Sequence, residues 1–191
     1  MSLAALAIEN PQTAYARLTA ARRGDPVEET LARMLASWMA GEGDMPKWLG
    51  LDEYEFRRMM QHHFPGFDVS ELHGIGSEVD LERGAEMDDL RKLLLASRTT
   101  CSQFETWMTS IVIAGCLGND HLWQDLGLWE RPDLSRLMLE NFRPLAIRNT
   151  KDMKWKKFLY KQLCETEGIY TCRAPSCEVC TDYTACFGTE E

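Results

Sequence analysis

The chain has 191 residues, of which 45% are hydrophobic, and a formal net charge of −9. This length is enough for one domain with a sizeable core, and the acidic balance argues against general nucleic-acid binding, which needs a basic surface. The longest apolar stretch, Met108–Leu117, is too short to span a bilayer. The first eight residues lack the basic segment of an export signal, so we expect a soluble, cytoplasmic protein.

Three helices are predicted in the N-terminal part, over residues 11–22, 25–41 and 52–65. Asn10 stands immediately before a proline, which is a common helix start. Asp25 is followed three residues later by Glu28, and Asp52 by Glu55, the spacing of a capping box. Apolar residues then recur at helical spacing in the second and third segments, so each helix has one face for a core.

The rest of the chain also has a helical pattern. Residues 66–84 contain four glycines and predict a long loop. Further helices are predicted over residues 85–98, 102–118 and 132–141, with a short segment at 120–129 and a last helix from Asn149 or Thr150 to about Glu165. The sequence therefore predicts an all-α fold of about six to eight helices. We expect residues 1–166 to form one helical domain, and residues 167–191 an irregular C-terminal loop that packs on it and is organised by a metal cluster.

Positive charge is concentrated in the last helical part of the chain. Residues 143–161 contain seven Lys and Arg against one Asp, a local net charge of +6, whereas residues 1–142 have a net charge of −10. On a helix, Lys154, Lys157 and Lys161 fall on one face. Such a face is often simply solvated. The alternative is an electropositive flank that stabilises a negative cluster or attracts an oxyanion.

Four of the seven cysteines lie within fifteen residues in the pattern C-x4-C-x2-C-x5-C: Cys172, Cys177, Cys180 and Cys186. Thiolates are soft ligands, and four on one short segment can surround a single metal centre. Two disulfides would need an oxidising compartment, and an odd total of cysteines fits a disulfide framework poorly. Four buried structural thiols are disfavoured because the segment is polar and without periodicity. The pattern therefore predicts a metal or cluster site.

The spacing favours an iron–sulfur cluster over zinc and leaves zinc open. Structural zinc sites usually have two C-x2-C pairs, and this segment has one. The first three cysteines match the C-x4-C-x2-C run of plant-type ferredoxins, although their fourth ligand lies far away. A cubane-type cluster is wider than one zinc ion, which suits the longer gaps.

Cys116 and His121 are a second candidate pair, in a glycine-containing break between two predicted helices. As metal ligands they would form an outer pair beside the main cluster. Cys116 ends an apolar run, which favours a core thiol, and His121 is suited to capping or hydrogen bonding within the loop.

Several segments resemble the NifQ family of nitrogen-fixation proteins. The resemblance covers roughly residues 45–189, is strongest from residue 118 onward, and includes the complete four-cysteine pattern. The segments that resemble the family are Met45–Leu51, His63–Gly66, Gly118–Leu128, Asn141–Ala146 and Asn149–Cys164.

The resemblance implies a metallocluster carrier with no enzymatic turnover. NifQ proteins are held to carry an iron–sulfur cluster that can include molybdenum, so the expected cargo is a [4Fe–4S], [3Fe–4S] or Mo–Fe3–S4 cluster with the four cysteines as ligands. The implied partners are the nitrogenase iron protein and the NifEN scaffold complex, to which molybdenum passes for iron–molybdenum cofactor assembly. We expect Lys154, Lys157 and Lys161 to attract molybdate, and His121 to complete the coordination of molybdenum.

Two other functions remain open at the level of sequence. A zinc-bound loop would make the chain a structural interaction protein, and a conventional [4Fe–4S] centre would make it a simple electron carrier. The sequence has no P-loop, dinucleotide fingerprint, nucleophile elbow or H-E-x-x-H motif, so nothing in it supports a hydrolase, kinase or nicotinamide enzyme.

Overall fold

The computed structural model describes residues 10–72, 75–77 and 84–167, and these residues form a helical domain without a strand. The all-α prediction is confirmed for this part of the chain, which has nine α-helices and two short 3-10 helices. None of these helices is long and apolar enough to cross a membrane. The elements are α1 (Pro11–Ala21), α2 (Val27–Met39), η1 (Lys47–Gly50), α3 (Glu53–His63), η2 (Val69–Leu72), α4 (Gly84–Ala96), α5 (Gln103–Cys116), α6 (Leu122–Asp125), α7 (Arg131–Asn141), α8 (Arg143–Ala146) and α9 (Trp155–Glu167).

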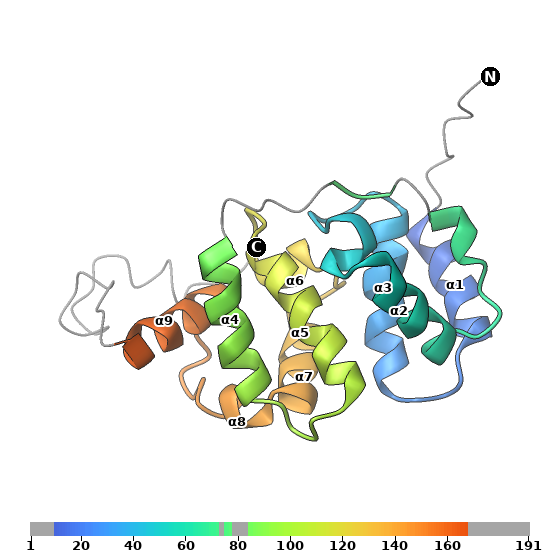
Figure 1. Ribbon diagram of the computed structural model, residues 1–191. Coiled ribbons are helices and arrows are strands. Elements are labelled where there is room, and N and C mark those ends of the chain that lie inside the picture. The colour runs from blue at the N-terminus through green and yellow to red at the C-terminus, as the bar shows by residue number, and fades with distance from the viewer. Residues whose placement is uncertain (1–9, 73–74, 78–83, 168–191) are drawn as a thin grey trace.

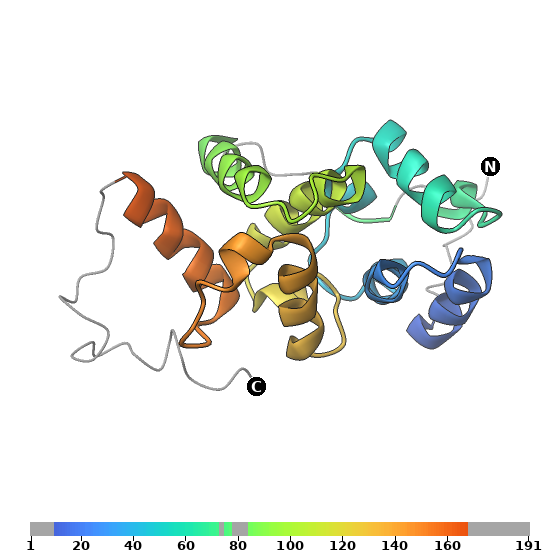
Figure 2. The same ribbon diagram turned by 90° about the horizontal axis from the view of Figure 1, so that it is seen from below.

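Helix α5 lies at the centre of the domain, with α1–α3 toward one end and α9 at the other (Figures 1 and 2). It packs against α3, α4, α6 and η1, and ten of its fourteen residues are buried. A single hydrophobic core runs from Leu18 in α1 to Leu159 in α9. Since the last helix shares this core, its position is determined by the packing of the whole domain.

One predicted helix cap is confirmed and another is shifted. The expected capping box at Asp25 does not form, because the N-cap of α2 is Pro26, which has no side-chain cap bond. The Asp25 carboxylate accepts the Val27 N–H at 3.2 Å, and the Glu28 carboxylate accepts the Asp25 N–H at 3.1 Å. Asp52 accepts the Glu55 N–H at 2.8 Å. Each of these bonds satisfies a backbone donor that has no partner within the helix.

Two features of the C-terminal part differ from the prediction. The last helix begins at Trp155, five or six residues after the expected caps Asn149 and Thr150. The Asn149 side chain instead bonds both the N–H and the carbonyl of Met153, at 2.8 Å each, and holds the preceding segment as a loop. The single-turn helix α8 was not predicted, because four residues are too few to show a periodic pattern.

A left-handed turn within η1 packs closely against the central helix α5. Trp48, Leu49 and Gly50 have positive φ values of 55°, 57° and 79°, a conformation that is costly for residues with a Cβ atom. A Cβ atom on Gly50 would lie 2.6 Å from the Ala114 Cβ atom of α5. Glycine is therefore required at position 50 both for its backbone conformation and for its close approach to α5.

We expect Gly50→Ala to lower the free energy of unfolding by about 2–4 kcal/mol, because it adds a steric conflict to the cost of the left-handed backbone. Gly66→Ala is the matched control: Gly66 also has a positive φ, 92°, but a Cβ atom added there would have no other atom within 4 Å. Urea unfolding should give a loss of only about 1–2 kcal/mol for this variant. Adding Ala114→Gly to Gly50→Ala should recover part of the loss, and equal losses at both glycines would contradict the steric account.

Candidate functional site

The predicted cluster ligands Cys172, Cys177, Cys180 and Cys186 lie outside the described residues. The described chain reaches Glu167, the last residue of α9 and five residues before Cys172. Five residues span at most about 18 Å, so chain length alone keeps Cys172 close to the C-terminal end of α9. Helix α9 and the segments around it are therefore the part of the candidate site that the structure describes.

A buried ion pair anchors α9 to α6 and to the loop that precedes α6. The Lys156 ammonium group contacts the carboxylate of Asp125 and donates a hydrogen bond to the Gly118 carbonyl at 2.8 Å. The Asp125 side chain is 1% exposed and that of Lys156 is 17% exposed. A buried charge without a partner is strongly unfavourable, so this pair fixes the first turn of α9 against the core.

The surroundings of Asp125 are closely fitted to its carboxylate. A Cβ atom on Gly118 would lie 2.5 Å from the Asp125 side chain, and the Asp120 N–H donates to Asp125 at 3.3 Å. Burial raises the pKa of the Asp125 carboxyl above its usual range, while Lys156 favours its ionised form. Lys156 is therefore the group that favours the charged form of the buried Asp125 carboxylate.

The inner face of α9 packs as its apolar pattern predicts. Trp155, Phe158 and Leu159 are buried, and Leu163 is partly buried. The Trp155 indole N–H donates to the Ser135 hydroxyl in α7 at 3.2 Å. The Tyr160 hydroxyl contacts Glu86 of α4. Helix α9 is thus held from two sides, by α4 and by the α7 region.

The loop before α9 is held from both of its sides. Asn149 forms its two bonds to Met153 inside the loop. From outside, the Arg131 guanidinium binds both carboxylate oxygens of Asp152 at 2.9 Å. Asp152 has a φ of 52°, and the bidentate contact supports this left-handed conformation. The loop is therefore a defined wall beside α9.

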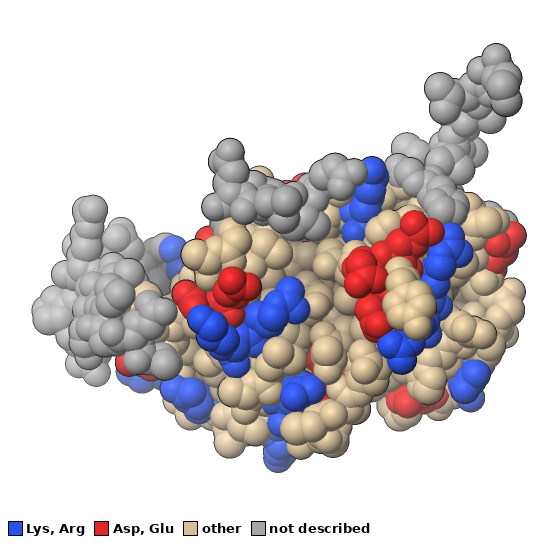
Figure 3. All heavy atoms as spheres, in the orientation of Figure 1, with Lys and Arg blue, Asp and Glu red and all other residues tan. Residues whose placement is uncertain are grey.

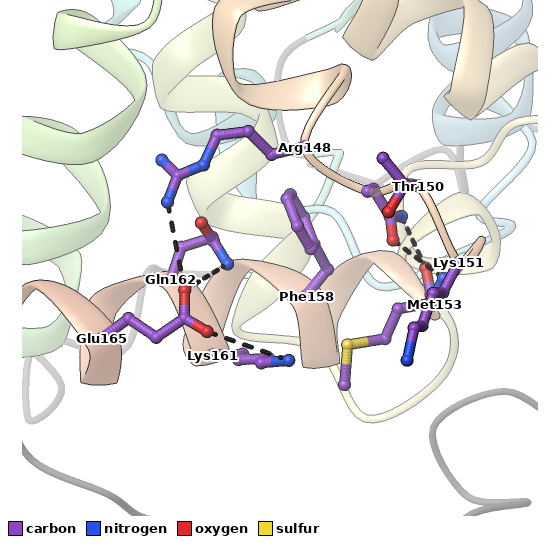
Figure 4. A pocket seen from close by; sticks show the side chains of 9 residues that line it. Arg148, Thr150, Lys151, Met153, Phe158, Lys161, Gln162 and Glu165 are labelled. Carbon is purple, nitrogen blue, oxygen red and sulfur yellow. Dashed lines mark hydrogen bonds and ion pairs between the residues drawn. The ribbon is translucent and has the colours of Figure 1, made fainter. Parts of the chain in front are cut away.

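A cavity of about 230 Å³ lies between this loop and α9 (Figure 4). Arg148 and Lys151 extend from the loop, and Lys161 from α9, around the ring of Phe158. Glu165 lies near two of these cations: its oxygens are 4.0 Å from Arg148 and 3.8 Å from Lys161. These separations exceed hydrogen-bond length. Other polar lining groups are Asn149, Thr150 and Gln162.

Of the three lysines predicted to attract molybdate, one lines the cavity. Lys161 lines the cavity, whereas Lys154 and Lys157 do not. Lys154 is partly buried just before α9, and Lys157 is exposed. Among the described residues, neither forms an ion pair.

The surface over α3 and α4 has a different charge pattern. Acidic and basic side chains lie side by side on the face that Figure 3 shows, and α3 and α4 contain the ion pairs Glu53–Arg57 and Asp89–Lys92. These charges largely compensate one another. By contrast, residues 143–161 contain seven Lys and Arg against one Asp.

Cys116 and His121 lie on different structural features. Cys116 is 2% exposed within the core, as expected for a core thiol. His121 is partly exposed and is the N-cap residue of α6, where the Gln124 side-chain oxygen accepts the backbone N–H of His121 at 3.2 Å. In the described ranges, no three His, Cys, Asp or Glu side chains form a group that could hold a metal ion. The loop that contains His121 contacts Lys156 in the first turn of α9. Lys156 lies about 16 Å along α9 from Glu167, the end of the helix nearest to the cysteines in sequence. A ligand role for His121 therefore requires that the cysteines lie near the first turn of α9.

Sequence reasoning did not single out Asp125, Arg148 or Lys151. The partner of Asp125 is 31 residues away, so no local pattern marks it. Arg148 and Lys151 belong to the basic stretch, but they precede α9 and do not share its helical face. Their common feature is the cavity, which exists only once the loop has folded back on α9.

Comparisons with known proteins give a consistent result. The sequence profile of the NifQ family matches residues 30–188, a range that includes all four clustered cysteines. Protein NifQ of Azotobacter vinelandii is 44% identical over 190 residues, which cover 90% of this chain and 97% of that protein. Protein NifQ homolog of Sinorhizobium fredii is 38% identical, with 84% and 70% covered. Protein NifQ of Klebsiella pneumoniae is 33% identical, with 85% and 99% covered. No solved structure matches the chain.

We expect Lys156→Met to lower the free energy of unfolding by about 3 kcal/mol, because it leaves Asp125 buried without its cation. Adding Asp125→Asn should recover at least half of this loss in chemical denaturation. Lys92→Met, which removes an exposed partner of Asp89, is the control and should change stability by less than about 0.5 kcal/mol.

The pH dependence of Lys156→Met has a defined sign. Without the cation, burial holds the folded-state pKa of Asp125 above the unfolded value of 3.8. The folded state then binds more protons, so stability falls as pH rises from the unfolded pKa through the folded pKa. The deficit should therefore be smaller at about pH 4 than at about pH 7; a deficit independent of pH, or no rescue by Asp125→Asn, would contradict the ion-pair account.

Proposed function

Because the chain belongs to the NifQ family of nitrogen-fixation proteins, we propose that it carries molybdenum in an iron–sulfur cluster and donates it to assembly of the nitrogenase iron–molybdenum cofactor. The observation that carries this proposal is the set Cys172, Cys177, Cys180 and Cys186 within the matched range. Four thiolates on one short segment are suited to a thiophilic cluster. The cluster is cargo in this function, and the chain acts as a carrier.

The cysteine segment follows directly on a firmly packed helix. Cys172 is five residues beyond Glu167, and α9 is held by the Lys156–Asp125 pair and by its apolar face. A carrier needs a segment that can release its cargo and a body that keeps that segment in a defined place. We propose that α9 supplies this fixed attachment point.

Charge supports uptake of molybdenum as an oxyanion. In the proposed function, Lys154, Lys157 and Lys161 favour the approach of molybdate to this end of the molecule, since positive surface groups raise the local concentration of anions. Three of the thiolates would hold iron, and the remaining cluster corner would accept iron or molybdenum, with His121 as the proposed additional ligand. The proposed recipients are the nitrogenase iron protein and the NifEN scaffold complex.

Two alternatives make different predictions for the same four thiolates. A structural zinc loop binds one colourless metal ion and no sulfide. A simple electron carrier binds iron and sulfide but no molybdenum. Elemental composition therefore separates all three functions.

We expect protein purified without oxygen from nitrogen-fixing cells supplied with molybdate to contain iron, acid-labile sulfide and molybdenum. Replacing all four clustered cysteines by serine should remove essentially all three, since thiolate ligation is lost. Cys101→Ser is the control, because Cys101 is an exposed cysteine outside the cluster, and it should retain wild-type contents. Zinc as the sole stoichiometric metal would refute the proposal, and iron and sulfide without molybdenum would favour the electron carrier.

A further inference from the structure

We propose that the cavity between the loop before α9 and α9 itself is a binding site for a tetrahedral oxyanion. The cations that line it are Arg148, Lys151 and Lys161, which lie on different sides of the buried ring of Phe158 (Figure 4). The inference rests on the proposed function only in naming molybdate as the physiological ligand. Binding itself is a property of the cavity and does not require a cluster.

The three cations are poorly satisfied by the protein. In the described part of the chain, the Arg148 guanidinium makes no hydrogen bond, and its distance to the Glu165 carboxylate is 4.0 Å. The Lys161 ammonium is 3.8 Å from the same carboxylate, and Lys151 has no acidic partner within the described ranges. Donors held near one cavity without acceptors are the requirement for oxyanion binding, because charge-assisted hydrogen bonds to oxyanions are the strong ones.

The wall that carries two of these cations is already ordered. Asn149 bonds twice to Met153 across the loop, so Arg148 and Lys151 flank a fixed turn. A preformed site loses less conformational entropy on binding than one assembled by the ligand. The loop geometry therefore favours binding even though the cationic side chains themselves are exposed.

Among the described residues that line the cavity, Glu165 is the one acid. Asp152, the one acid of the basic stretch, is bound on the loop by Arg131 and does not line the cavity. Glu165 is shared between Arg148 and Lys161 and also accepts a bond from Gln162 at 3.0 Å. An oxyanion in the cavity would replace Glu165 as the acceptor of both cations. Glu165 thus acts as a weak internal competitor.

The site lies close to the start of the cysteine segment. Lys161 is six residues before Glu167, about 9 Å along the helix, and Cys172 follows five residues later. An oxyanion held here lies within reach of the segment that is proposed to carry molybdenum. The cavity is therefore suited to serve as the entry point of the metal as its oxyanion.

Equilibrium dialysis of the full chain with molybdate tests the site. We expect Arg148→Gln and Lys151→Gln each to weaken binding about tenfold or more, since each removes a charged donor. Arg143→Gln is the matched control: it removes one charge from the same basic stretch at an exposed position that does not line the cavity, and it should bind as the wild type does. Glu165→Gln should tighten molybdate binding about threefold or more, because it removes the carboxylate that competes for Arg148 and Lys161.

The results that overturn the proposal are equally definite. No saturable binding by the wild type, or the same weakening in Arg143→Gln as in Arg148→Gln, excludes a defined site. Competition by sulfate identifies a general site for tetrahedral oxyanions, and its absence identifies a site selective for molybdate; both support the proposal. The variant with all four clustered cysteines replaced by serine separates the two proposals: retained molybdate binding with lost iron supports the cavity independently of the cluster, and lost binding overturns it.

Discussion

The buried pair of Lys156 and Asp125 is the interaction on which the C-terminal part of the domain depends. It joins α9 to the end of α6, in a place where Gly118 leaves just enough room for the carboxylate. Because neither charge is stable there alone, α9 has one favourable position on the core. That position creates the cavity beside α9 and sets the point from which the cysteine segment starts.

The positive charge of residues 143–161 has several roles once it is folded. Lys156 is paired inside the domain with Asp125. Arg148, Lys151 and Lys161 surround a cavity, while Lys154 and Lys157 remain beside it as general electrostatic groups. The sequence indicates a single basic helical face for this stretch. In the fold, its cations instead serve as a structural cation, as the lining of a candidate oxyanion site and as a solvated surface. Surface charge at long range aids approach, whereas fixed donors at short range provide binding.

Sequence reasoning succeeded where the deciding interactions are local. The cap at Asp52 was predictable because its bond reaches only three residues, and the apolar spacing within α9 agrees with its buried face. It failed for the start of α9, where Asn149 closes a loop on Met153 and Arg131, 21 residues away in sequence, holds Asp152. The partner of Asp125 and the shared cavity of Arg148 and Lys161 were equally out of reach, since only the tertiary fold brings them together. The four cysteines stay a sequence-based prediction, strengthened by the family to which the chain belongs.

The central claim is that this protein holds molybdenum on thiolates within an iron–sulfur cluster, after receiving it as an oxyanion. X-ray absorption at the molybdenum edge of anaerobically purified protein tests this most directly, because it reports which atoms surround the metal. The account predicts sulfur neighbours and a shell of iron scatterers around molybdenum, both absent from the variant with the four clustered cysteines replaced by serine. Molybdenum surrounded by oxygen alone in the wild-type protein would contradict it.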